Sequence, residues 1–387
     1  MKILSEIIKR KNSKNDVNAV VGVEIKNRRI ALQRTLLSVS YKICSISYLC
    51  KLENNRILGN TLYVREICDR VDLTKDKIDV LLNLKKILVG VVEAFIAGDI
   101  DYLKKAVIDG EGLNNYRYQI IQMVYYIAVF DLYNASILYN QILKLVSSLT
   151  DFDLNVMCLF SSIFLYLDSN FNDARELLHS IGYQNDENAE LLRKIYILYC
   201  DIALDYKEAL LDYNELIMDI NMAGKHFLLD QINYPMAMYS IKNGFSLKNK
   251  YINQIMDQKL KKSAIFMDLY IRNEKIKLSD FPDNKINDSC RILKIIMKDK
   301  AKAKEEIDKL SLNYYRCDIS IEFLKYQVIE DINEKADYII DIVIPTIKRT
   351  EEAALGRFFL KELLRISSQS FKYKQFYHAY EELGNLL

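Results

Sequence analysis

The stretch Cys44-Ser-Ile-Ser-Tyr-Leu-Cys-Lys-Leu-Glu-Asn-Asn-Arg56 is the most informative segment of the chain. Ser45 suits the start of a helix, because its hydroxyl can accept a hydrogen bond from a backbone amide of the first turn. Leu49 and Leu52 follow three residues apart, which is the spacing of one helix face. A short helix at this position, after another short helix and a turn, is typical of the second half of a helix-turn-helix.

Four short helices are expected around this stretch. The first runs from Glu24 to Arg34, and Thr35 is placed to cap a second that ends near Tyr41. The third spans residues 46–54 and the fourth spans residues 61–71. Four short amphipathic helices in so few residues predict a compact bundle.

Glycine and proline are scarce along the whole chain. Its 387 residues include 11 Gly and 3 Pro, whereas 50% of them are hydrophobic. So few helix breakers argue against a strand-rich fold and for helices nearly end to end. We expect an all-α chain with a helix-turn-helix domain over residues 1–74. After a polar hinge, a right-handed α-solenoid of helical hairpins is expected over residues 78–387.

A weak repeat supports the solenoid. A small residue near the start of a second helix recurs at Ala135, Ala174 and Ala209, and more faintly at Ala303. Such a residue allows two helices to approach closely. The pattern resembles degenerate tetratricopeptide repeats, whose period is about 34 residues. An unrelated helical array remains open and would change the architecture little.

Charge is distributed unevenly between the two parts. Residues 1–79 contain 16 Lys and Arg against 9 Asp and Glu, and the remainder contains 38 against 43. A basic N-terminal part on a mildly acidic body favours a nucleic-acid partner for that part alone. A lysine-rich terminus that only aids solubility is the alternative.

Seven cysteines are scattered through apolar segments and form no Cys-x-x-Cys pair, which is typical of reduced thiols. The longest apolar runs, such as residues 87–92, are far shorter than a membrane span, and the N-terminus lacks a signal-peptide core. We therefore expect a soluble, cytoplasmic protein without a membrane partner.

Residues for catalysis are not grouped in this sequence. The three histidines are far apart without metal-ligand spacing, and no glycine-rich phosphate loop occurs. These features predict a protein that is not an enzyme and that needs no metal or cofactor.

The N-terminal segment resembles the lambda-repressor-like (Xre-type) helix-turn-helix family. Residues 43–55 carry the resemblance, and Tyr63 with Ile67-Cys68 extends it. The resemblance implies a recognition helix in the major groove of double-stranded DNA. It also implies a structural ion pair between Arg29 and Glu53. The DNA-contacting residues that it implies are Arg34, Thr35, Ser45, Ile46, Ser47, Cys50, Lys51, Asn54, Asn55 and Arg56.

Three positions depart from the family pattern. Leu36 replaces the usual glutamine, Lys42 the glycine of the turn, and Gly59 the proline after the recognition helix. Leu36 cannot form a hydrogen bond with phosphate or base. A helical bundle that no longer binds DNA and serves in dimerisation or docking therefore remains an alternative.

The two parts together resemble the peptide-sensing regulators of Gram-positive bacteria and their phages, the Rgg, PlcR, PrgX and ComR group. This resemblance implies a homodimeric transcription regulator for quorum sensing that binds a short peptide in its helical-repeat groove. It does not identify peptide-binding residues in this chain. A module of the Rap type, whose N-terminal bundle binds a protein rather than DNA, is the second hypothesis.

Overall fold

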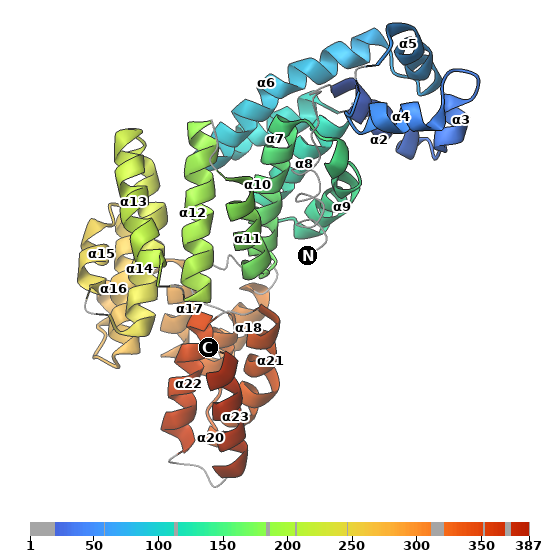
Figure 1. The fold of residues 1–387 in the computed structure, drawn as a ribbon. Coiled ribbons are helices and arrows are strands. Elements are labelled where there is room, and N and C mark those ends of the chain that lie inside the picture. The colour runs from blue at the N-terminus through green and yellow to red at the C-terminus, as the bar shows by residue number, and fades with distance from the viewer. Residues whose placement is uncertain are drawn as a thin grey trace. The chain divides into compact units, whose positions relative to one another are not determined.

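The computed structural model describes residues 20–57, 59–111, 115–182, 186–205, 207–245, 247–310, 321–350, 353–367 and 373–386. Regular structure in these residues is helical, with no strand among them (Figure 1), which confirms the expected all-α fold for this part of the chain. The first 19 residues of the predicted domain 1–74, and Cys317, lie outside the described residues. The chain divides into two compact units.

Four helices at the start of the first unit form a small bundle, called the head below. They are α2 (Val20–Ala31), α3 (Leu36–Ser40), α4 (Ile46–Glu53) and α5 (Thr61–Arg70). Thr35 and Ser45 cap α3 and α4 as expected, each accepting a hydrogen bond of 3.1 Å from an amide of the first turn. The first helix ends at Ala31 rather than Arg34, because Gln33 adopts a left-handed backbone with φ 52°.

One apolar core holds the head together. It is formed by buried side chains from all four helices and the turns between them, and Leu36 packs against it as a half-buried residue. The buried members are Ile25, Val39, Ile43, Leu49, Leu52, Ile67, Cys68, Val71 and Leu73. The helices are too short to be stable alone, so this shared core fixes their arrangement.

The first unit continues from the head into five further helices, called the first body helices. They are α6 (Lys75–Ala97), α7 (Ile100–Asp109), α8 (Tyr116–Ala128), α9 (Leu132–Leu143) and α10 (Asp151–Leu167), with a 3-10 turn η1 (Val146–Ser148) before α10. Thr74 caps α6, and Gly98 ends it in a left-handed conformation with φ 70°. This unit comprises residues 1–168 and 176–193.

The second unit comprises residues 169–175 and 194–387, so the boundary runs within α11 (Phe171–Ile181) and α12 (Glu187–Leu204). Buried side chains from α19 to α23, including Tyr326, Phe359 and Leu363, form one of its cores. Its further helices are α13 (Ala209–Met222), α14 (Leu229–Asn243), α15 (Lys248–Gln254), α16 (Gln258–Ile271), α17 (Asp288–Ile296), α18 (Lys300–Leu310), α19 (Ile321–Val328), α20 (Ile332–Tyr338), α21 (Ile344–Thr350), α22 (Ala353–Ser367) and α23 (Tyr373–Leu386). Short 3-10 turns η2 (His226–Leu228), η3 (Leu278–Asp280) and η4 (Asp283–Lys285) and a π-helix, η5 (Ile339–Val343), interrupt the series.

The repeated alanines lie where helices pack closely. Ala135, Ala174 and Ala303 are 0% exposed and Ala209 is 1% exposed. In three of the four copies a non-glycine residue with positive φ precedes the alanine by four or five positions, at Phe130, Ser169 and Asp205. Each of these three copies is therefore a helix, a left-handed turn residue and a second helix with a small residue near its start.

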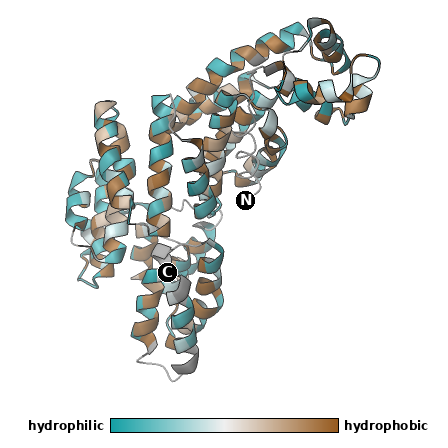
Figure 2. Ribbon diagram, viewed as in Figure 1, coloured by the Kyte–Doolittle hydropathy of each residue, from teal (hydrophilic) through white to brown (hydrophobic). Residues whose placement is uncertain are grey.

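Hydrophobic and hydrophilic residues alternate along most helices (Figure 2), which is typical of helices that bury one face. In the described part of the chain, no helix combines the length and the apolar character that a membrane crossing requires.

Candidate nucleic-acid interface

The first turn of α4 presents its side chains to solvent. Ser45, Ser47 and Lys51 are exposed, and Ile46 is 45% exposed. The opposite side of the helix carries Leu49 and Leu52, which are buried in the head core. The helix is therefore held by one face and offers a mixed surface of hydroxyl, aliphatic and ammonium groups on the other.

Arg29 and Glu53 form the ion pair expected between α2 and α4. Two guanidinium nitrogens, Nε and Nη2, donate to the two carboxylate oxygens at 2.7 and 2.8 Å. Nη1 donates to the carbonyl oxygen of Arg34 at 3.2 Å. Glu53 is 2% exposed, so its charge depends on this bidentate partner. The pair fixes the angle between α2 and α4.

Arg70 ties α5 to the end of α3, a role that was not anticipated from the sequence. Its Nη1 donates to the carbonyl oxygens of Val39 and Tyr41 at 3.1 and 2.6 Å. The Arg34 guanidinium, expected to contact phosphate, donates to the carbonyl oxygen of Arg70. The last carbonyls of a helix have no partner within it, so Arg70 satisfies groups that this turn leaves open.

Each of the three departures from the family pattern has a structural counterpart. Lys42 adopts a left-handed backbone with φ 62°, the conformation for which glycine is favoured. Leu36 packs on the head core. A Cβ at Gly59 would lie 2.1 Å from Cγ2 of Val64, so a larger residue would require this turn to shift. Lys42 thus occupies a backbone conformation that favours glycine, and Leu36 and Gly59 have roles in local packing.

The C-terminal end of α4 faces the first body helices rather than solvent. Asn55 is 1% exposed and donates to the carbonyl oxygen of Ser148 at 2.6 Å. Asn54 Oδ1 accepts hydrogen bonds from the hydroxyls of Ser147 and Ser148, both at 3.1 Å. The phosphate contacts expected for Asn54 and Asn55 are therefore not open to these side chains in this structure. The sequence alone does not distinguish an asparagine at the end of a helix that contacts DNA from one that contacts another part of the protein.

Lys26 joins the same contact from α2. Its ammonium group donates to the hydroxyls of Ser147 and Ser148 at 3.0 and 2.7 Å and to Asn54 Oδ1 at 3.2 Å. Of the other residues expected at DNA, Cys50 is half-buried, whereas Thr35 and Arg56 are exposed. The exposed residues among those expected to contact DNA thus lie mainly on the first turn of α4 and around it.

Glu24 makes a second contact between the head and the first body helices. It is 1% exposed, and its Oε2 accepts from the backbone amide of Tyr116 at 3.4 Å. Tyr116 donates in turn to Asp153 at 2.6 Å, and Arg117 pairs with the same carboxylate at 2.9 Å. Burial raises the pKa of Glu24 to about 7, against smaller opposing effects of the Tyr116 amide and Arg28.

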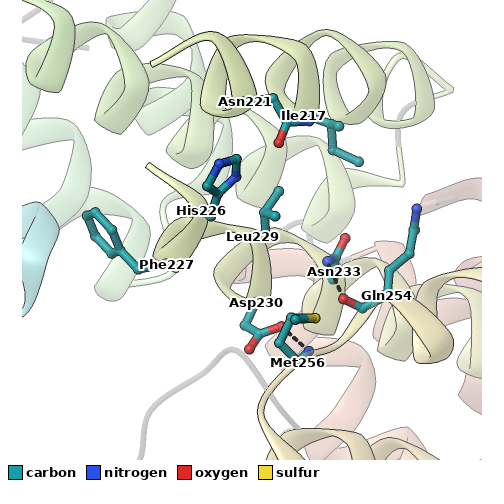
Figure 3. Close-up of a pocket in the computed structure, with 9 residues that line it drawn as sticks. All are labelled: Ile217, Asn221, His226, Phe227, Leu229, Asp230, Asn233, Gln254 and Met256. Carbon is teal, nitrogen blue, oxygen red and sulfur yellow. Dashed lines mark hydrogen bonds between the residues drawn. The ribbon is translucent and has the colours of Figure 1, made fainter. Parts of the chain in front are cut away.

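The second unit contains a pocket of about 580 Å³ between α13, η2, α14 and α15 (Figure 3). Its apolar wall includes Ile217, Leu229 and Met256, and its polar groups include the amides of Asn221 and Gln254. Met222 and Met256 are 80% and 74% exposed. Within the described residues, no group of three or more His, Cys, Asp and Glu could hold a metal ion.

No family model matches the chain, and no curated protein matches it. Among solved structures, the chain is similar to the apo form of the competence regulator ComR from Streptococcus vestibularis, with 14% sequence identity and a TM-score of 0.39. The similarity covers 65% of this chain and 97% of ComR.

Proposed function

We propose that the chain is a DNA-binding transcription regulator whose α4 enters the major groove. The observation that carries the proposal is the exposed first turn of α4, with Ser45, Ile46 and Ser47, on a helix whose other face is packed in the head core. A helix held in this way can present its N-terminal side chains to base edges without reordering.

The exposed groups suit both parts of DNA recognition. Serine hydroxyls can donate or accept at a base edge, and the Ile46 side chain can pack on a thymine methyl. Lys51 and Arg56 supply exposed positive charge for phosphates. One α4 covers one half-site, so we propose a homodimer that reads two half-sites about one DNA turn apart.

The test is fluorescence anisotropy of the full chain with DNA from its own upstream region and with a scrambled duplex, at two salt concentrations. We expect specific binding that weakens with salt, because phosphate contacts release counterions. The double variant Ser47→Ala/Lys51→Ala should lose specific binding. Lys104→Ala, which removes an exposed lysine on α7, is the matched control and should bind as the wild type does. Equal affinity of wild type and double variant would refute the proposed interface.

We further propose that a short peptide controls the regulator by binding the pocket of the second unit. The exposed Met256 in the lining can adapt to varied apolar side chains, and the Asn221 amide can pair with the N–H and C=O groups of an extended peptide. The Oε1 atom of Gln254 already accepts a hydrogen bond from the Tyr213 hydroxyl at 2.9 Å, so its amide group is available as a donor. The test is calorimetric titration with synthetic peptides from small reading frames beside the gene. Met256→Gln, in the pocket lining, should weaken binding strongly, and Met297→Gln, at a 45% exposed methionine elsewhere in this unit, should not.

One observation favours the alternative of a protein-interaction module. Leu37, Tyr41 and Leu62 are 59%, 59% and 71% exposed on the head, which is more apolar surface than a DNA-binding face requires. Indifference to DNA at low salt, together with a stable complex that Leu37→Asp/Tyr41→Asp disrupts, would favour this alternative.

A further inference from the structure

Glu24 is a buried carboxyl group at the contact between the head and the first body helices. It lies on α2, and its Oε2 accepts two long hydrogen bonds of 3.4 Å, from the amide of Tyr116 at the start of α8 and from the side chain of Asn27. Tyr116 is itself 0% exposed. The carboxyl group is therefore enclosed at the point where α2 meets α8.

The positive charge near Glu24 compensates the negative charge of its ionised carboxylate only in part. On its own helix, Arg28 Nε lies 3.3 Å from Oε1, but neither atom has a well-aligned hydrogen bond. The charge of Arg28 also acts on the exposed Asp72 just before α6.

From the α8 side, the Tyr116 hydroxyl donates to Asp153, and Arg117 places Nε and Nη2 at 2.9 and 3.1 Å from the same carboxylate. Both groups are thus engaged with α10. An ionised Glu24 has weak support at this buried position, whereas the neutral, protonated form costs less to bury.

We propose that Glu24 is a proton-dependent latch, which holds α2 against the start of α8 when protonated and weakens that contact when ionised. The proposal concerns the contact itself and goes beyond the proposed function, since it holds whether or not the head binds DNA. The second contact, from Lys26 and Asn55 to Ser148, keeps the head attached while the Glu24 contact weakens.

The direction of the pH effect follows from the higher affinity of Glu24 for its proton when the contact is closed. The pKa of Glu24 is about 7 in the closed contact and returns toward 4.5 when the group reaches water. The closed contact binds the proton more tightly, so it is fully favoured below pH 4.5 and loses that advantage as the pH rises to about 7. Between pH 5.5 and pH 8 the ratio of closed to open contact should fall roughly thirtyfold.

The test is hydrogen exchange of the full chain, read by mass spectrometry at pH 5.5, 6.5, 7.5 and 8. Exchange in a peptide that covers the first turn of α8 is compared between wild type and Glu24→Gln at each pH, so that the intrinsic dependence of exchange on pH cancels. Glutamine keeps the shape of the protonated side chain and cannot ionise. A peptide from α16 in the second unit serves as an internal reference.

We expect exchange of the wild type in the first turn of α8, relative to that of Glu24→Gln, to increase roughly thirtyfold from pH 5.5 to pH 8. Glu66→Gln, which neutralises an exposed carboxylate on α5, should keep the wild-type dependence. Equal exchange of wild type and Glu24→Gln at every pH would overturn the proposal. So would a wild-type dependence on pH that persists in Glu24→Gln.

Discussion

The guanidinium group of Arg70 donates a hydrogen bond of 2.6 Å to the carbonyl oxygen of Tyr41, and so connects α5 to the turn that leads into α4. The same nitrogen lies 3.1 Å from the carbonyl oxygen of Val39. One side chain thereby satisfies carbonyl groups at the open end of α3 and at the turn that follows it.

Arg70→Met should therefore destabilise the head. It keeps much of the aliphatic packing but removes the donors, and the loss of a hydrogen bond that is not fully buried costs about 0.5–1.5 kcal/mol. Thermal unfolding followed by circular dichroism measures the effect. Arg65→Met, which replaces an exposed arginine on the same helix, is the control and should change the melting temperature little. Equal melting temperatures for the two variants would show that Arg70 does not have this role.

Lys42→Gly should stabilise the chain. The lysine has φ 62°, and a residue with a Cβ is strained there by roughly 1 kcal/mol relative to glycine. Its ammonium group also lies 5.4 Å from the ring centroid of Tyr41, a contact that is weak at an exposed site. Lys42→Ala removes the charge and keeps the Cβ, so it should give no gain in denaturant unfolding. A gain with alanine as large as with glycine would point to charge rather than backbone strain.

Asn55 should be intolerant of alanine and less sensitive to glycine. Both changes remove the 2.6 Å hydrogen bond to Ser148, which costs about 1–3 kcal/mol because the carbonyl is left buried. The residue also has φ 53°, so alanine adds backbone strain that glycine avoids. Chemical denaturation should rank the stabilities as wild type, Asn55→Gly and then Asn55→Ala. The reverse order of the two variants would contradict the left-handed conformation.

Asp201 should make the second unit less stable as the pH rises. Burial, followed by a hydrogen bond with Asp212, raises the pKa of Asp201 from 3.8 to about 7, although Arg175 opposes the shift. The folded state binds the proton more tightly, so the stabilisation is complete below pH 3.8 and is lost as the pH rises through about 7.

Asp201→Asn should flatten this dependence, as measured by denaturant unfolding between pH 4 and pH 8. Asp212→Asn should also reduce it, because the amide can donate to the Asp201 carboxylate and favour its ionised form. A slope unchanged in both variants would refute the assignment to this carboxyl pair.

Features with local causes could be predicted from the sequence. Thr35 and Ser45 cap α3 and α4 because the hydroxyl bonds an amide three residues ahead, which needs no knowledge of the rest of the fold. The Arg29–Glu53 pair is a longer contact, and the family resemblance rather than the spacing indicated it. The buried alanines of the repeat could be predicted because a small residue recurs near the start of a helix at a regular spacing in the sequence.

Features that depend on distant partners were not predictable. Asn55 bonds to Ser148, 93 residues away, and nothing near Asn55 distinguishes a partner in the protein from a phosphate. Arg70 could have been suspected only by asking which group satisfies the last carbonyls of a short helix without a terminal glycine. DNA binding, the peptide and the homodimer stay predictions for the experiments above.

The left-handed residues Phe130, Ser169 and Asp205 share a backbone conformation, although their side chains are an aromatic ring, a hydroxyl and a carboxylate. Ala135 and Ala174, which follow two of these turns, are fully buried, so the start of the second helix is closely packed in both copies. In these three copies the left-handed turn recurs although the type of residue at the turn does not. A comparison of backbone torsion along the chain would recover related hairpins after their residue identities have diverged.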